Sequence, residues 1–103
     1  MSETKYYHSI SEFYPFYLSE HSSQTSRRLH FIGTTIALVL LITAIATQMW
    51  WLIAIAIVQG YTLAWSGHFF FEHNNPATFI YPWLSFLSDW CMWWEILIGR
   101  IRF

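Results

Sequence analysis

Apolar residues dominate the middle of the chain. Between Arg28 and Glu72 there are 43 consecutive residues without Asp, Glu, Lys or Arg. One helix that crosses a bilayer needs about 20 apolar residues, so a run of this length predicts two spans and a tight turn. We place the turn around Gln48, the most polar residue of the run, and the two helices at residues 29–47 and 50–71. The pattern therefore predicts an antiparallel transmembrane helical hairpin.

The segments on both sides of this hairpin are aromatic and amphipathic. Residues 9–21 predict a short helix with Pro15 in its first turn, where proline is best tolerated. Residues 82–98 predict a helix with tryptophan, leucine and isoleucine on one side and a polar stripe on the other. The stripe consists of Ser85, Ser88, Asp89, Met92, Glu95, Gly99 and Arg102. Both segments are typical of interfacial helices. The first could instead pack on the protein, and the second could form a third span.

Composition supports this fold class. Hydrophobic residues make up 55% of the 103 residues and charged residues 11%, against about 25% charge in soluble domains. We therefore predict a single all-α integral membrane domain, residues 1–103. The net charge of −1 offers no basic surface, so we expect no nucleic-acid partner. Cys91 is the only cysteine, which excludes an internal disulfide.

The charges also predict an orientation. All five Lys and Arg residues lie outside the hairpin and its turn is uncharged, so both termini are expected in the cytoplasm. The N-terminal residues lack the pattern of a secretory signal, so we expect the first span to stay in the mature protein. Glycine and alanine form small-residue faces on both helices, which predict helix contacts and also contacts between copies in a homo-oligomer.

Histidines gather at the open end of the hairpin. At a rise of 1.5 Å per residue, His30 and His68 both lie about 27 to 30 Å from the turn, so we expect them to meet. His21 would face away from His30 on a continuous helix, so it joins them only if the chain breaks between residues 22 and 26. Glu72 follows His68 by four residues and would share its helix face.

Three interpretations of these polar groups follow from the residues. Imidazole is the commonest protein ligand for iron, zinc and copper, and three histidines leave coordination positions open for reaction. Two histidines on facing helices could instead bind haem axially. Alternatively, each histidine bonds to backbone or lipid phosphate in a noncatalytic membrane protein that contacts lipid or a partner. Glu72 could equally pair with Arg27 or Arg28.

Two signatures in the chain resemble those of a small membrane family first catalogued as a domain of unknown function. The first is a pair of histidines, His21 and His30, separated by eight residues just before an apolar helix. The second is the series Gly-His, Phe-Glu and Pro-Ala over residues 67–77. The fungal members of this family are iron(II)-dependent dioxygenases that shorten 2-hydroxy fatty acids by one carbon, in fatty acid alpha-oxidation.

The resemblance implies an Fe²⁺ site with His21, His30 and His68 as ligands and Glu72 as a further catalytic residue, with zinc as the alternative metal. It also implies a 2-hydroxy fatty acid substrate, whose tail we expect among the phenylalanines at 69–71 and the aromatic C-terminal helix. The chain is much shorter than the fungal enzymes and shows one hairpin rather than two. That difference affects the expected substrate more than the expected metal. The length of the chain is similar to that of the compact bacterial members, so the resemblance implies a bacterial inner membrane as its location.

Overall fold

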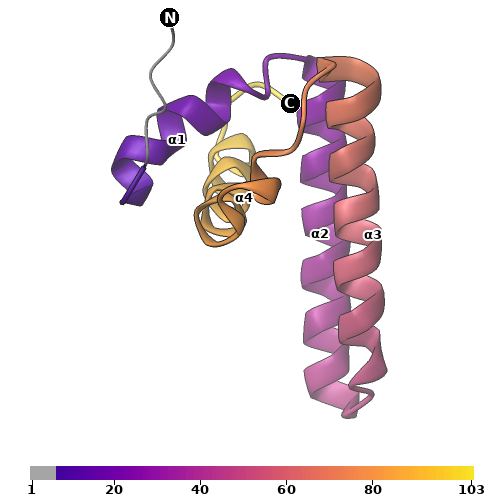
Figure 1. The fold of residues 1–103 in the computed structure, drawn as a ribbon. Coiled ribbons are helices and arrows are strands. Elements are labelled where there is room, and N and C mark those ends of the chain that lie inside the picture. The colour runs from indigo at the N-terminus through magenta and orange to yellow at the C-terminus, as the bar shows by residue number, and fades with distance from the viewer. Residues whose placement is uncertain (1–6) are drawn as a thin grey trace, which may run out of the picture.

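The protein is all-helical over residues 7–103, the part that the computed structural model describes. This part of the chain contains four α-helices and no strand (Figure 1), and the all-α prediction is confirmed. A π turn extends the third helix, and a short 3₁₀ turn precedes the fourth. In chain order the elements are α1 (Ile10–Ser19), α2 (Gln24–Thr47), α3 (Trp51–Gly67), the π turn (His68–Glu72), the 3₁₀ turn (Ala77–Phe79) and α4 (Pro82–Leu97).

The two long helices, α2 and α3, lie side by side and are joined by a short turn at residues 48–50 (Figure 1). Gln48 ends α2 in the left-handed conformation, with φ 57°. A Cβ atom placed on Gly33 would lie 3.4 Å from the carbonyl oxygen of Gly60. Because neither residue has a side chain, the two backbones approach closely at this level, as the small-residue faces predict.

Serine side chains set where the first two helices begin. Ser9 accepts a hydrogen bond from the N–H of Glu12, so α1 begins at Ile10 and Pro15 lies inside the helix rather than in its first turn. Ser23 accepts from the N–H of Ser26, and α2 therefore begins earlier than the predicted residue 29. Each serine satisfies an N–H group of a first helical turn. The break between α1 and α2 is consequently short.

α1 and α4 pack together beside the end of the α2–α3 pair that is opposite the turn (Figure 1). The serine side of α4 is turned into the protein, where Ser85 and Ser88 are buried, while Trp83 and Trp94 are exposed. The side of α4 that faces the surroundings is therefore aromatic. The small core shared with α1 consists of Phe13, Tyr17, Ala77, Met92 and Ile96.

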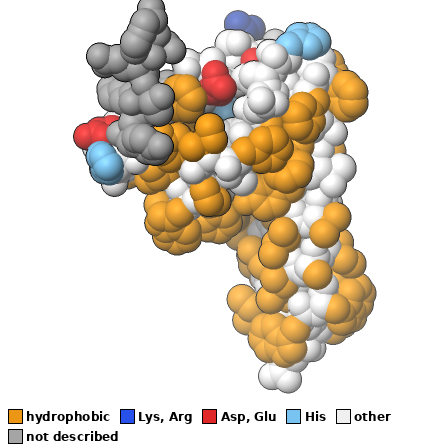
Figure 2. Space-filling model, in the orientation of Figure 1, with side chains coloured by type: hydrophobic (Ala, Val, Ile, Leu, Met, Phe, Trp, Pro, Cys, Tyr) orange, Lys and Arg blue, Asp and Glu red, His pale blue; other side chains and the backbone are white. Residues whose placement is uncertain are grey.

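Much of the surface of the long helices is apolar, as Figure 2 shows. The helical segments Gln24–Thr47 and Trp51–Glu72 are both long and apolar enough to cross a membrane. The mean hydropathy of their most apolar 18 residues is 2.2 and 1.2, respectively. Side chains such as Val39 and Val58 are 58% and 66% exposed. Contiguous apolar surface of this kind marks contact with a membrane or a partner.

The close approach of α2 and α3 predicts a stability effect at Gly33. In Gly33→Val, the added methyl groups overlap the Gly60 carbonyl and Leu63, because a Cβ alone already lies 3.4 Å from each. We expect a loss of about 1–3 kcal/mol of stability, measured as a lower melting temperature in detergent. Gly60→Ala is the matched control, since its Cβ meets only the Gly33 oxygen at 3.9 Å. A Gly33→Val protein as stable as Gly60→Ala would contradict the prediction.

Candidate metal centre

Three histidines from three segments converge at the end of the helix pair opposite the turn. His21 lies in the loop between α1 and α2, His30 in α2, and His68 at the junction of α3 with the π turn. Their side chains are 1%, 5% and 3% exposed. One potential ligand atom of each lies within 4.8 Å of the others, and the Nε2 atoms of His21 and His30 are 3.1 Å apart. The structure thus brings together all three residues predicted as metal ligands.

Hydrogen bonds orient each imidazole ring. The Nδ1 atom of His21 lies 2.6 Å from the carbonyl oxygen of Tyr17, and that of His30 lies 3.1 Å from the carbonyl oxygen of Ser26. The Nδ1 atom of His68 lies 2.7 Å from the side-chain oxygen of Asn74. A carbonyl oxygen only accepts hydrogen bonds, so each Nδ1 carries the proton and each Nε2 presents a lone pair.

This arrangement places unprotonated nitrogens against one another. A hydrogen bond between the Nε2 atoms of His21 and His30 would need an additional proton, making one ring cationic. Burial, followed by the nearby His30, lowers the pKa of His21 well below its ordinary value, so that proton is disfavoured. Neutral imidazoles that donate their other N–H to a carbonyl are the usual form of metal-bound histidine. The donor set therefore fits a metal cation.

The loop that carries His21 is held from both sides. The ring of His21 stacks on that of Tyr17, with centroids 4.1 Å apart, and the Tyr17 hydroxyl donates to Asp89 on α4. Arg27 donates to the carbonyl oxygens of His21 and Ser22, each at 3.0 Å. These contacts turn the loop back toward α2, which is how His21 reaches His30 in spite of their unfavourable spacing on a continuous helix.

Glu72, predicted to act beside the metal, has a different position. Its two carboxylate oxygens accept from the Ser22 hydroxyl at 3.1 Å and from the Ser23 N–H at 2.8 Å. Glu72 lies outside the cluster of ligand atoms found among residues 7–103, and no ion pair joins it to Arg27 there. The Glu72 carboxylate, at the end of the π turn, is directed at the loop before α2 rather than at the histidine nitrogens. Glu72 instead ties the end of α3 to the start of α2.

Asn74 is the polar residue at this centre that sequence reasoning missed. Its amide nitrogen donates to the Glu20 carbonyl at 3.1 Å, which leaves the amide oxygen to accept from His68. The Asn74 N–H also donates to the His68 carbonyl at 3.1 Å, the same oxygen that accepts from the His73 N–H at the end of the π turn. His73, with φ 58°, ends the turn and is exposed. The sequence signal for this turn is the pair of asparagines directly after the helical pattern, because asparagine favours turns.

An apolar groove begins beside the histidines. His30 forms part of its wall, and its volume is about 220 Å³. Asp89 also lines the groove, and burial raises the pKa of its carboxyl from 3.8 to about 7, against the opposing effect of the Tyr17 hydroxyl. The remaining lining residues are Gly33, Thr34, Ala37, Leu41, Ile53, Ala56, Ile57, Gly60, Tyr61, Ala64, Phe86 and Trp90.

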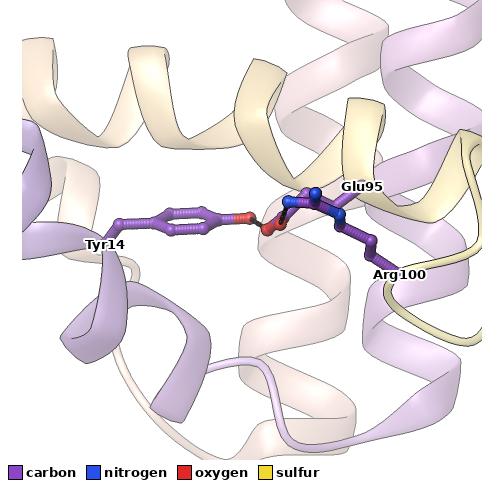
Figure 3. A network of polar contacts seen from close by, with 3 residues as sticks. All are labelled: Tyr14, Glu95 and Arg100. Carbon is purple, nitrogen blue, oxygen red and sulfur yellow. Dashed lines mark hydrogen bonds and ion pairs between the residues drawn. The ribbon is translucent and has the colours of Figure 1, made fainter.

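A second polar contact fixes α1 against α4 away from the histidines. Figure 3 shows the Tyr14 hydroxyl directed at Glu95, with Arg100 on the other side of the carboxylate. The Tyr14 oxygen donates to Glu95 at 2.5 Å, and Arg100 lies 3.9 Å from the second carboxylate oxygen. Burial and the Glu95 carboxylate both raise the pKa of Tyr14. Tyr14 therefore remains a hydrogen-bond donor that positions α1.

The fold and the site together describe a small helical protein with a buried three-histidine centre. A family model described as 2-hydroxy-palmitic acid dioxygenase Mpo1-like matches residues 7–101, which include all three histidines. The chain belongs to this family, and the predicted resemblance is confirmed. Searches of the curated proteins and of the solved structures found no match.

The hydrogen bond between Asn74 and His68 predicts an effect on metal affinity. In Asn74→Leu, the His68 ring loses the acceptor that keeps Nε2 directed at the other histidines. We expect metal affinity to fall by about 10- to 100-fold, measured by competition with a coloured chelator in detergent. His73→Ala, a change at an exposed neighbour, should bind metal as the wild type does. Equal affinities in Asn74→Leu and the wild type would show that this bond does not position the ligand.

The raised pKa of Asp89 predicts a pH dependence of stability. The folded protein holds the Asp89 proton more tightly than the unfolded chain does, between the ordinary value of 3.8 and the folded value of about 7. Stability contributed by this group therefore falls as pH rises through that window. Asp89→Asn retains an oxygen that can accept from Tyr17 but does not titrate. The melting temperature of the wild type should fall relative to that of Asp89→Asn as pH increases from 4 to 7. If the difference between the two melting temperatures stays constant over this range, Asp89 is not the source of the pH dependence.

Proposed function

We propose that this protein is an integral membrane, iron(II)-dependent dioxygenase that shortens 2-hydroxy fatty acids by one carbon. The observation that carries the proposal is the convergence of three buried histidines, whose potential ligand atoms all lie within 4.8 Å of one another. The family description, which names a 2-hydroxy-palmitic acid dioxygenase, supplies the reaction class. In this proposal His21, His30 and His68 hold the ion.

Iron is favoured by the chemistry that the family description requires. Three neutral imidazoles are suitable ligands for iron, zinc or copper and leave coordination positions for other molecules. Bound iron(II) supplies the redox chemistry that lets dioxygen react with an organic substrate, whereas zinc has no redox activity. Zinc in the same site would direct the function toward hydrolysis or structure instead.

The residues of the chain prepare the site for such a reaction. The carbonyl acceptors of Tyr17, Ser26 and Asn74 keep the three imidazoles neutral and oriented. Burial of the histidines excludes water. Asp89 on the groove wall, with a pKa of about 7, can hold a proton on the carboxyl oxygen that does not accept from Tyr17. It can therefore form a hydrogen bond with the polar head of a 2-hydroxy acid that enters from the groove.

A membrane position explains the exposed apolar surfaces. We place α2 and α3 across the bilayer and α1 and α4 at its interface, where the exposed Trp83 and Trp94 of α4 are suited to the boundary. Arg27 and Arg28 lie at the start of α2 and Arg100 and Arg102 follow α4, whereas the turn between α2 and α3 carries no charged residue. By the positive-inside tendency, the histidine centre faces the cytoplasm of a bacterial cell. A lipid substrate then reaches the site from the membrane.

Haem is a less suitable occupant than a single ion. The rings of His30 and His68 lie edge to face with centroids 5.2 Å apart, and the ring of His21 is 4.4 and 4.6 Å from them. A macrocycle must fit between its two axial ligands, whereas these rings contact one another. The spacing favours a small cation.

Metal content and turnover together test the proposed function. Protein purified anaerobically in detergent should contain near one iron per chain and consume dioxygen with 2-hydroxypalmitic acid to give a product one carbon shorter. His30→Ala and His68→Ala should lose the iron and more than about 100-fold of the activity, because each removes a ligand. His73→Ala, at an exposed position, is the control. Full activity in either ligand variant, zinc in place of iron, or a folded protein without metal would overturn the proposal, and the last result would support a noncatalytic role.

A further inference from the structure

The groove beside His30 runs along the α2–α3 pair in an ordered series of levels. Gly33 lies opposite Gly60, and the same antiparallel register places Ala37 near Ala56. Leu41 and Ile53 also line the groove and form its last level, nearest the turn. At 1.5 Å per residue, Leu41 lies about 16 Å along α2 from His30. The groove is thus long and narrow.

The chemistry of the groove wall changes with depth. The polar side chains Thr34, Tyr61 and Asp89 accompany His30 in the wall. The levels nearer the turn are made of Ala37, Leu41, Ile53, Ala56 and Ile57, all apolar. A molecule that matches this wall has a polar head beside the histidines and an unbranched apolar chain that extends toward the turn.

We infer that this groove holds the acyl chain of the 2-hydroxy acid and that Ala37, Leu41 and Ile53 determine the chain length that is accepted. The inference rests on the proposed function, which places the polar head at the three histidines. His30 is part of the groove wall, which favours this occupant. An acyl chain whose polar head lies at the histidines must leave the centre along a surface that begins beside them.

The phenylalanines expected to hold the tail are placed elsewhere. Phe69, Phe70 and Phe71 are 45%, 69% and 48% exposed, and none of them lines the groove. The π turn carries them around the outside of α3 while it directs His68 inward. The acyl chain therefore follows the small-residue side of the helix pair rather than the aromatic side of the π turn.

Two substitutions should change chain-length preference in opposite directions. Ala37→Leu fills the middle of the groove and displaces about three methylene groups of a bound chain. Each buried methylene contributes about fourfold in affinity, so long acids should bind on the order of tens-fold more weakly while short acids are unaffected. Leu41→Ala opens the far end and should favour longer acids. Ala54→Leu adds the same volume on an exposed part of α3 outside this groove and is the matched control.

Photo-cross-linking locates the chain directly and does not depend on turnover. The probes are 2-hydroxy fatty acids of increasing length with a diazirine at the last carbon, applied to the full-length protein in detergent. Mass spectrometry should place the adducts of long probes near Leu41 and Ile53, with competition by unlabelled 2-hydroxypalmitic acid. Ala37→Leu should lose the labelling by long probes and keep that by short ones, whereas Ala54→Leu should label as the wild type does.

The outcomes separate the two proposals. Competed labelling in the groove supports the inference even in a preparation that does not turn over 2-hydroxy acids, which would overturn only the proposed reaction. Adducts at Phe69–Phe71 would overturn the acyl-chain site, even if the enzyme is fully active. Labelling that is equally reduced in Ala37→Leu and Ala54→Leu would overturn it too. If Ala37→Leu does not fold, an unchanged length preference in Leu41→Ala overturns the inference.

Discussion

Three buried imidazoles packed against one another impose the main constraint on this structure. Neutral nitrogens held as close as 3.1 Å gain nothing from one another, and a cation bound by them would convert the same geometry into a favourable one. The surrounding contacts all act on ring orientation: backbone carbonyls hold His21 and His30, and the Asn74 amide holds His68. The short break after α1 and the π turn after α3 are the local departures from helix that these orientations require.

The sequence was sufficient for the fold class, for the two long apolar helices and for the three histidines. The first two follow from hydrophobic periodicity and length, and His30 and His68 follow from equal distances to a turn at Gln48. It did not specify the position of Glu72, whose carboxylate is directed at the loop before α2. The partner of Glu72 is a loop 50 residues earlier, a contact that no local pattern specifies.

Small residues serve two purposes along the helix pair. Gly33 and Gly60 let the backbones approach, and the missing side chains leave a groove on the side of the same contact. Packing and ligand space therefore compete for the same positions. A larger residue at Gly33 would clash across the helix contact, and larger residues at the neighbouring wall positions would fill the space beside His30.

The order of the three histidines along the chain has a consequence for how the centre is assembled. His21 and His30 are separated by nine residues, but His68 and the Asn74 that orients it follow the complete second long helix. During synthesis the third histidine and the asparagine that orients it are therefore made only after α2 and α3. The three-histidine cluster cannot form in a shorter nascent chain, so its assembly reports that both long helices have been made and brought together.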